Sequence, residues 1–225
     1  MRHYSPNKLK NNSMTPMLDV GGFILVGGMS SRMGTDKSRL VFGDQTSVAL
    51  IAASLQSVAG TVRTVGAAVP ALEGLANIAD AHDQWGPLAG IEAALCNANS
   101  EYCLVVACDL PFVTAELFER LIGLADHWDA IVPLQSDGRP QPLCAIYRRS
   151  ACLATARKAI ANGEHSPRAL LDQVNTRYVP FTELSDLDGS DYFFFNVNTP
   201  ENYERSQEIL RSRLRVSEPS ASDGQ

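Results

Sequence analysis

The sequence predicts a single α/β domain built on a mostly parallel sheet, with helices on both faces of the sheet. Three observations predict this fold class. The chain has 225 residues, enough for one ordinary domain with its own core. Apolar runs of strand length alternate with segments of helical spacing. The two most apolar runs, residues 22–26 and 101–107, are typical of strands that are buried on both faces.

The predicted elements follow one another in a βαβα order, which favours parallel strands. Strands are expected over residues 22–26, 61–68, 101–107, 129–134, 143–147, 177–180 and 192–197, with a short apolar segment at 76–79. Helices are expected over residues 46–59, 88–97, 115–125, 150–161, 168–174 and 200–215. Residues 19–216 are expected to form the domain, between polar tails at 1–18 and 217–225.

Local signals justify the helices. The first is predicted by apolar residues that recur at steps of three and four, namely Val48, Ile51, Leu55 and Val58. Pro87 is typical of a first helical turn, and Thr114 of an N-cap. The last helix is expected to begin at Thr199-Pro200.

Composition excludes several classes of function. The net charge of −6 argues against broad nucleic-acid binding, although a local basic site for phosphates remains compatible with it. No apolar run reaches the roughly 20 residues of a membrane span. The 5 cysteines form no C-x-x-C pair, which excludes a zinc ribbon and predicts reduced core thiols in a cytoplasmic protein.

The first candidate site is the segment L-V-G-G-M-S-S-R-M-G-T-D-K, residues 25–37, which directly follows a predicted buried strand. Gly27 and Gly28 carry no Cβ, so backbone N–H groups can approach phosphate oxygens closely. Arg32 and Lys37 add positive charge, and the segment could hold a triphosphate. It matches neither the P-loop nor the dinucleotide-binding pattern. The alternative is a flexible glycine turn with two solvated cations.

Asp109 is the second candidate, because it follows the strand at 101–107 directly. Ligands of parallel sheets bind beyond the carboxyl ends of the strands. Mg²⁺ takes few protein carboxylates and fills its shell with phosphates and water, so one aspartate that faces a triphosphate would suffice. The alternative is a carboxylate that caps the turn before Pro111.

Two further segments carry weaker signals. The Gly86-Pro87 helix start predicts free N–H groups at a positive dipole end, and Gly90 permits close approach by a ligand or a packed strand. Asn196 and Asn198 would share one face at the end of a strand, where they could bind a polar ring or a metal-bound water, or cap the next helix.

The remaining polar residues are interpreted as structural or left open. His82, Asp83 and Trp85 are expected to be surface and packing residues, since no second histidine stands at metal-ligand spacing. Arg139, in R-P-Q-P, and the pair Arg148-Arg149 could contact an anionic acceptor or be solvated charges.

The chain resembles the molybdenum cofactor guanylyltransferases of the MobA type over about residues 20–208. The motifs that carry the resemblance are, in this order, the glycine-rich segment, G-P-L-A-G, C-D-L-P and N-V-N-T-P. The resemblance implies a Rossmann-like domain similar to that of the nucleotide-diphospho-sugar transferases. It implies GTP and molybdenum-bound molybdopterin as substrates, Mg²⁺ as cofactor, and transfer of GMP with release of pyrophosphate. It also names molybdoenzymes or their chaperones as candidate partners, with neither nucleic acid nor membrane involved.

The resemblance also assigns roles to individual residues. The expected nucleotide contacts are Leu25, Val26, Gly27, Gly28, Lys37, Gly66, Asp80 and Asp109. Lys37 matches the phosphate-binding lysine, Asp109 the magnesium carboxylate, and Asn196 and Asn198 a motif on the acceptor side. We expect Lys37, Asp109 and Arg32 to carry the catalysis. Many members have an asparagine just after the second strand, where Gly66 stands here and could contribute only its backbone.

Two alternative functions stay open on the sequence. A related enzyme could transfer CMP to molybdopterin, or a nucleotide to another phosphorylated acceptor such as a sugar phosphate or isoprenoid precursor. A non-catalytic module could bind the cofactor and hand it to a molybdoenzyme. The presence of both Lys37 and Asp109 argues against the second alternative.

Overall fold

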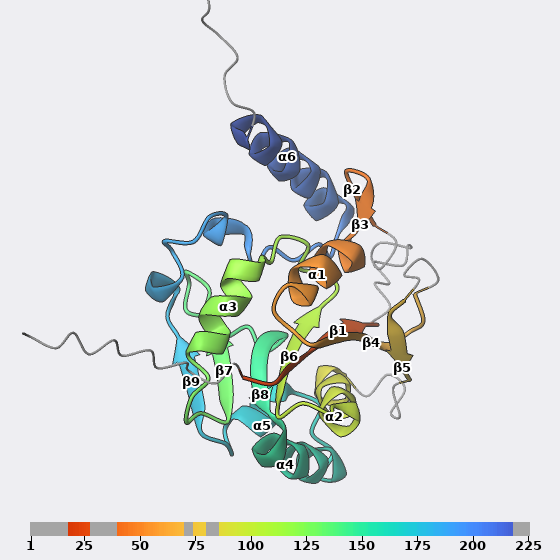
Figure 1. Ribbon diagram of the computed structural model, residues 1–225, viewed down its shortest axis with the longest axis vertical. Coiled ribbons are helices and arrows are strands. Elements are labelled where there is room, and N and C mark those ends of the chain that lie inside the picture. The colour runs from red at the N-terminus through yellow and green to blue at the C-terminus, as the bar shows by residue number, and fades with distance from the viewer. Residues whose placement is uncertain (1–17, 28–39, 70–73, 80–85, 218–225) are drawn as a thin grey trace, which may run out of the picture.

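The computed structural model describes residues 18–27, 40–69, 74–79 and 86–217 (Figure 1). Within this part of the chain, strands and helices alternate around one large sheet. None of the described helices is long and apolar enough to cross a membrane.

The large sheet has seven strands in the order β5-β4-β1-β6-β8-β7-β9. Their bounds are β1 Val20–Val26, β4 Thr61–Gly66, β5 Ala76–Ile78, β6 Tyr102–Ala107, β7 Ala130–Pro133, β8 Cys144–Arg148 and β9 Thr176–Val179. All neighbours are parallel except β8, which runs antiparallel to both β6 and β7. The sheet is therefore mostly parallel, as predicted, with one reversed strand.

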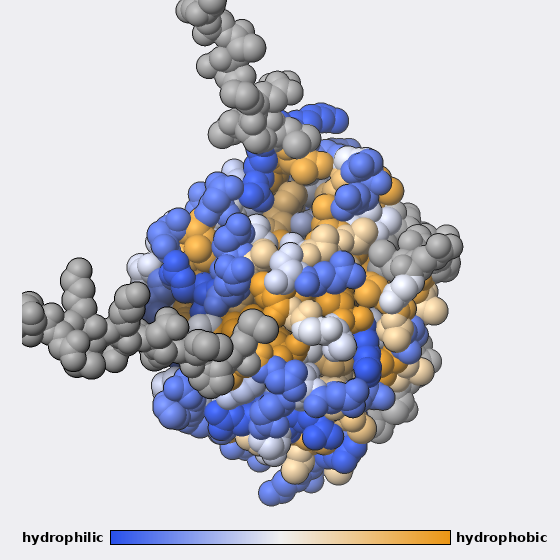
Figure 2. All heavy atoms as spheres, in the orientation of Figure 1, coloured by the Kyte–Doolittle hydropathy of each residue, from blue (hydrophilic) through white to orange (hydrophobic). Residues whose placement is uncertain are grey.

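The helices form two layers, with α1 and α3 on one face of the sheet and α2, α4 and α5 on the other (Figure 1). Their bounds are α1 Ser47–Gln56, α2 Pro87–Asn97, α3 Ala115–Gly123, α4 Arg149–Ala161, α5 Pro167–Leu171 and α6 Pro200–Ser217. Hydrophilic residues dominate the surface over α4 and α5 at the bottom of the view, because these helices bury their apolar sides against the sheet (Figure 2).

Each helix forms for a reason that is visible in the sequence. Val48, Ile51 and Leu55 are fully buried on one side of α1. The hydroxyl of Thr114 accepts a hydrogen bond of 3.3 Å from the N–H of Leu117, so the predicted N-cap of α3 is confirmed. The expected helix at 168–174 is shorter in the structure, where α5 ends at Leu171.

Two local predictions need correction. Residues 192–197 form no strand: a 3-10 turn, Ser190–Tyr192, is followed by irregular chain. The structure also contains a small hairpin that the sequence pattern did not predict, formed by β2 Val41–Phe42 and β3 Gln45–Thr46. Its turn contains Gly43 at a φ of 67°, a conformation that glycine adopts without strain.

Candidate functional site

The candidate site lies at the carboxyl ends of the central parallel strands β4, β1 and β6. From β1 the chain continues to β4 and β5 on one side, and then crosses to β6 on the other side of β1. The direction of winding therefore reverses beside β1, and ligands of open α/β sheets bind at such a switch point. Gly27 follows β1 at this edge and Asp109 follows β6 closely.

Both neighbouring strands fix the end of β1. The carbonyl of Leu25 accepts a hydrogen bond of 3.1 Å from the N–H of Cys108, and that of Val26 accepts one of 2.8 Å from Ala67. Gly27 is exposed, and a Cβ at this position would meet no described atom within 4 Å. Hydrogen bonds from both neighbours thus hold the strand end firmly, and no described residue crowds Gly27.

Gly66 closes the neighbouring strand β4 at a position that only glycine fits. Its φ is 102°, and a Cβ there would lie 2.2 Å from the carbonyl oxygen of Val26. The Asn77 side chain donates a hydrogen bond of 3.3 Å to the Gly66 carbonyl and accepts one of 2.8 Å from the Thr64 hydroxyl. The close approach of two backbones therefore accounts for this glycine without a ligand.

Asp109 lies half-buried in the turn that follows β6. The N–H of Leu110 closes this turn by donating to the carbonyl of Ala107, at 3.3 Å. From the first turn of α1, the buried Ser47 hydroxyl donates to the carbonyl of Cys108. The backbone around Asp109 is thus held from both sides.

The segment around Asn196 and Asn198 is joined directly to Asp109. The N–H of Val197 donates a hydrogen bond of 3.0 Å to the carbonyl of Asp109, and the Val197 side chain is buried. Asn196 is exposed and Asn198 half-buried on either side of it. The structure therefore brings both asparagines to the Asp109 segment, although the strand predicted to carry them is absent.

Thr199 is the N-cap of α6. The hydroxyl of Thr199 accepts a hydrogen bond of 3.2 Å from the N–H of Asn202. The same hydroxyl hydrogen-bonds the Glu201 carboxylate and lowers its pKa. The cap that was an alternative role for the asparagines therefore belongs to Thr199.

An aromatic cluster supports the site, and sequence reasoning missed it. The ring of Phe112 lies 6.3 Å from the rings of both Phe42 and Phe195. Tyr203 of α6 stacks edge-on against Phe42 at 5.6 Å, and its hydroxyl donates to the carbonyl of Val41 at 2.7 Å. The cluster joins the β2–β3 hairpin, the Asp109 turn and the asparagine segment. The signal in the sequence that could have indicated this cluster is an aromatic residue close to each of the C-D-L-P and N-V-N-T-P motifs.

The start of α2 differs from its prediction. Gly86 has a φ of 91° and a ψ of −179°, a region used almost only by glycine. Pro87 has no N–H, Leu88 donates to the carbonyl of His165 at 3.3 Å, and Ala89 donates back to Gly86 at 3.2 Å. The expected free N–H groups are therefore already hydrogen-bonded within the protein.

Gly90 has a packing role. A Cβ at this position would lie 3.1 Å from a methyl group of Leu25 on β1. Of the two alternatives for this glycine, the packed strand is the one that the structure shows. The G-P-L-A-G motif thus sets the distance between α2 and the strand that leads into the candidate site.

Four of the predicted site residues, Gly28, Arg32, Lys37 and Asp80, lie outside the described residues. His82, Asp83 and Trp85 lie outside them as well. The structure brings together the remaining ones at one edge of the sheet, namely Leu25, Val26, Gly27, Gly66, Asp109, Asn196 and Asn198.

Among the described residues of this edge, Asp109 is the one whose side chain suits Mg²⁺. Its carboxylate offers the hard oxygen ligand that Mg²⁺ prefers, and the metal needs only one or two such ligands when phosphates supply the rest. No cluster of three or more metal-ligating side chains occurs among the described residues. A single carboxylate at this edge fits a metal whose remaining ligands come from a bound triphosphate and water.

The cysteines are poorly suited to nucleophilic catalysis. Burial raises the pKa of Cys103, Cys144 and Cys152 to about 12 in each case. Cys108 is buried as well, and Cys96 is exposed on α2. The thiols of Cys103, Cys144 and Cys152 therefore stay protonated near neutral pH. The four buried cysteines are core residues, as predicted, whereas the exposed Cys96 departs from that prediction.

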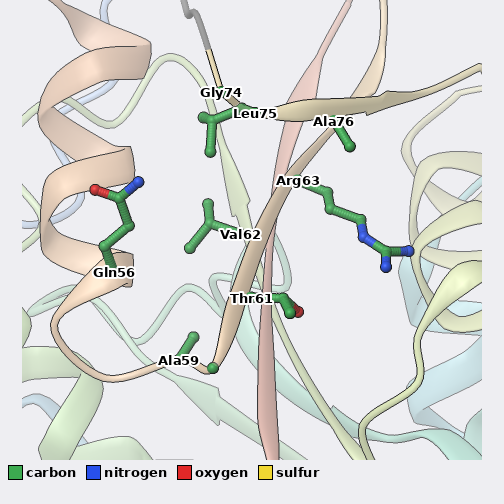
Figure 3. Close-up of a pocket in the computed structure, with 9 residues that line it drawn as sticks. Gln56, Ala59, Thr61, Val62, Arg63, Gly74, Leu75 and Ala76 are labelled. Atoms are coloured by element: carbon green, nitrogen blue, oxygen red, sulfur yellow. The ribbon is translucent and has the colours of Figure 1, made fainter.

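A pocket of about 420 Å³ lies at the opposite edge of the sheet, near the amino ends of β4 and β5. Figure 3 shows its lining residues, which are Gln56, Ala59, Gly60, Thr61, Val62, Arg63, Gly74, Leu75 and Ala76. Its long polar side chains, Gln56 and Arg63, point apart on opposite sides of β4 (Figure 3). They do not converge on one ligand, and the length of the strands separates the pocket from Asp109.

Comparison with known proteins agrees with this geometry. A family model described as the MobA-like NTP transferase domain matches residues 22–178. A protein of Pelotomaculum thermopropionicum named probable molybdenum cofactor guanylyltransferase is 34% identical over 193 residues, covering 85% of this chain and 93% of the relative. The molybdenum cofactor guanylyltransferase of Desulfosudis oleivorans is 30% identical over 197 residues, covering 86% and 96%.

Solved structures share the fold. Molybdopterin-guanine dinucleotide biosynthesis protein A from Archaeoglobus fulgidus superposes with a TM-score of 0.74 at 28% identity, covering 85% of this chain and 99% of that one. The 2-C-methyl-D-erythritol 4-phosphate cytidylyltransferase of Thermus thermophilus superposes with a TM-score of 0.64 at 17% identity, over 86% of this chain and all of that one (100%). The second likeness shows the fold alone.

Proposed function

The chain belongs to the MobA-like NTP transferase family, and from this premise we propose that it transfers GMP from Mg–GTP to molybdenum-bound molybdopterin. The products would be the guanine dinucleotide form of the cofactor and pyrophosphate. The nearest alternative is transfer of CMP, or of a nucleotide to another phosphorylated acceptor. The proposed enzyme acts in the cytoplasm, with molybdoenzymes or their chaperones as candidate recipients of the product.

The observation that carries the proposal is the position of Asp109 at the switch point of the sheet. Gly27, which no described residue crowds, follows the neighbouring strand β1 at the same edge, and the Val197 hydrogen bond ties the asparagine segment to Asp109. A nucleotide on the β1 side and a phosphorylated acceptor on the Asn196 side would meet next to this carboxylate. Relatives named as guanylyltransferases support GTP as the nucleotide.

The proposed reaction is an in-line displacement. An oxygen of the acceptor phosphate monoester attacks the α-phosphorus of GTP, the bond from that phosphorus to the bridging oxygen breaks, and pyrophosphate leaves. No protein nucleophile is needed, since positioning and charge neutralisation supply most of the catalysis. Bound Mg²⁺ would offset the negative charge of the triphosphate, including the charge that develops on the leaving pyrophosphate.

The roles of the chain's own residues follow from this scheme. Asp109 would hold the metal, and Lys37 and Arg32 would bind the phosphates. The backbone near Leu25, together with Gly66 and Asp80, would contact the base side of the nucleotide. Asn196 and Asn198 would orient the acceptor. For Lys37, Arg32 and Asp80 these roles rest on the sequence motifs.

A panel of nucleoside triphosphates tests the proposal. Purified enzyme, Mg²⁺ and molybdenum-loaded molybdopterin are mixed with GTP, CTP, ATP or UTP, and pyrophosphate release and the dinucleotide product are measured. We expect turnover with GTP well above that with the other nucleotides. Preference for CTP would reject the guanylyl assignment, and nucleotide binding without turnover would favour the non-catalytic module.

A further inference from the structure

The reversed strand β8 separates two groups of arginines that the sequence left as equal candidates for the acceptor. Cys144 at the start of β8 pairs with Val106 near the carboxyl end of β6, and Arg148 pairs with Tyr102 at its amino end. Arg139 precedes β8 and Arg148 ends it. The two arginines therefore lie toward opposite edges of the sheet. Arg139 lies toward the edge that carries Asp109, and Arg148 lies toward the other.

Arg148 and Arg149 have structural partners at the far edge. The Arg148 guanidinium donates to the Tyr102 hydroxyl at 2.9 Å and lies 3.5 Å from the carboxylate of Asp129. Arg149 donates to the carbonyl of Leu95 at 3.0 Å. These contacts explain both arginines without a ligand.

The β7–β8 connection, in contrast, is anchored beside the candidate site. The N–H of Ala107, the last residue of β6, donates to the carbonyl of Leu143 at 2.8 Å. At its other end, the N–H of Gln141 donates to the carbonyl of Pro133 at 2.9 Å. The connection therefore leaves and re-enters the sheet at the carboxyl ends of β6 and β7, on the side of Asp109 that faces away from β1.

The turn within this connection has a defined conformation. The N–H of Gln135 donates to the carbonyl of Arg139 at 2.9 Å, and Gly138, with a φ of 82°, donates back to Gln135 at 2.8 Å. The Asp137 carboxylate accepts from the backbone N–H of Arg139 at 3.1 Å and from its Nε at 2.6 Å. The Arg139 side chain is nevertheless 75% exposed.

This geometry leaves one side of the guanidinium available for a ligand. The Nε–H of Arg139 donates to Asp137, and the two Nη groups have no partner among the described residues. Two parallel N–H donors match two oxygens of a phosphate. A guanidinium that is already oriented loses less conformational entropy when it binds.

We propose that Arg139 binds the phosphate monoester of the acceptor, and that Asp137 is a positioning residue that orients the guanidinium. The inference rests on the proposed transferase function and assigns its acceptor side. The hydrogen bonds that the Asp137 carboxylate accepts from Arg139 lower its pKa, which keeps it charged at neutral pH. Arg139 thus binds from the β7–β8 side, opposite the nucleotide on the β1 side.

The test measures KM separately for the two substrates. Arg139→Ala should raise KM for molybdenum-loaded molybdopterin by about 10- to 100-fold, the range for one charge-assisted bidentate interaction, while KM for GTP changes less than about twofold. Arg139→Lys should restore part of the affinity, because it keeps the charge without the fork. Asp137→Asn should raise acceptor KM by a smaller factor.

The matched control is Arg211→Ala, which removes one charge from an exposed arginine on α6. It should leave both KM values unchanged. Equal effects of Arg139→Ala and Arg211→Ala on acceptor KM would overturn the inference, as would a parallel rise of both KM values in Arg139→Ala. If the parent enzyme transfers no nucleotide to molybdopterin, the proposed function itself fails, which separates the two outcomes.

Discussion

The backbone N–H of Val197 donates a hydrogen bond of 3.0 Å to the carbonyl oxygen of Asp109. This hydrogen bond joins two motifs that lie far apart in the sequence, C-D-L-P and N-V-N-T-P. Because the Val197 side chain is buried with Leu40 and Phe42, the asparagines on either side of it are held beside the carboxylate. The bond uses only backbone atoms of Asp109, so the side chain can be changed without breaking it.

Asp109→Asn should therefore fold normally and lose metal-dependent turnover. The substitution keeps the shape of the side chain and removes the charge that would hold Mg²⁺. We expect transfer to fall by about 10²-fold or more, with an unchanged thermal midpoint. Turnover at several Mg²⁺ concentrations, beside thermal unfolding, measures both. Near-parental turnover at saturating Mg²⁺ would remove Asp109 from the mechanism.

Gly66→Ala should destabilise the protein more than Gly74→Ala does. Both glycines have a φ of 102°, but a Cβ at Gly66 would meet the carbonyl of Val26 at 2.2 Å, whereas one at Gly74 would meet no described atom within 4 Å. The difference between the two variants isolates the clash, which we expect to cost about 1–3 kcal/mol in the free energy of unfolding. Denaturant titration measures it.

The same pair of variants links the strand ends to the nucleotide. A shift of Val26 moves the start of the glycine-rich segment, so Gly66→Ala should raise KM for GTP and Gly74→Ala should not. Equal loss of stability in both variants would show that the backbones at Gly66 separate at little cost, contrary to this account.

Lys37→Ala and Asp80→Ala should differ in their effect on nucleotide choice. Lys37 is expected to contact phosphates, which all nucleoside triphosphates share, so its loss should lower kcat/KM for GTP and CTP by similar factors. The Asp80 carboxylate could accept hydrogen bonds from the N1–H and amino group of guanine, so its loss should narrow the preference for GTP. If only Lys37→Ala alters the ratio, the two assignments are reversed.

Deletion of both tails should leave the domain intact. Leu18 packs against the core and α6 ends at Ser217, so the shortened chain should keep residues 18–217. The deleted segments show no apolar periodicity and should bury little surface. The thermal midpoint and the GTP affinity should match those of the full chain. A large loss of either would mean that a tail docks on the domain.

Thiol reactivity should separate Cys96 from the other four cysteines. At pH 8 the folded protein should react rapidly with a disulfide reagent at Cys96 alone, because the other cysteines are buried. In denaturant all 5 should react. Cys96→Ser supplies the control and should abolish the fast phase. Rapid reaction of a second thiol in that variant would contradict the packing of the core.

The raised thiol pKa values also set the sign of a pH dependence. Cys103, Cys144 and Cys152 have a pKa of about 12 when folded and 9.0 as their ordinary value. The unfolded chain therefore loses these protons first as pH rises. The contribution to stability is complete below pH 9, and the free energy of unfolding should fall as pH increases from 9 toward 12.

Sequence patterns predicted the elements well where burial follows a simple period. The strands at β1 and β6 are apolar throughout because both of their faces are covered by helices. The prediction for residues 192–197 was wrong for a physical reason. Phe193, Phe195 and Val197 suit a strand, but they pack their side chains into hydrophobic clusters while their backbone joins no strand ladder.

Local sequence patterns were enough to predict the family, the order of most helices and strands, and the residue types expected to carry the chemistry. These follow from local composition, periodicity and motif spacing. Only the tertiary structure decided that β8 runs backward, which places Arg139 toward the edge of Asp109 and Arg148 toward the opposite one. It also decided that Gly66 is required by the backbone of Val26, and that Val197 joins the asparagines to Asp109. Strand direction and backbone contacts of this kind depend on which distant segments meet, and no local pattern in the chain records that.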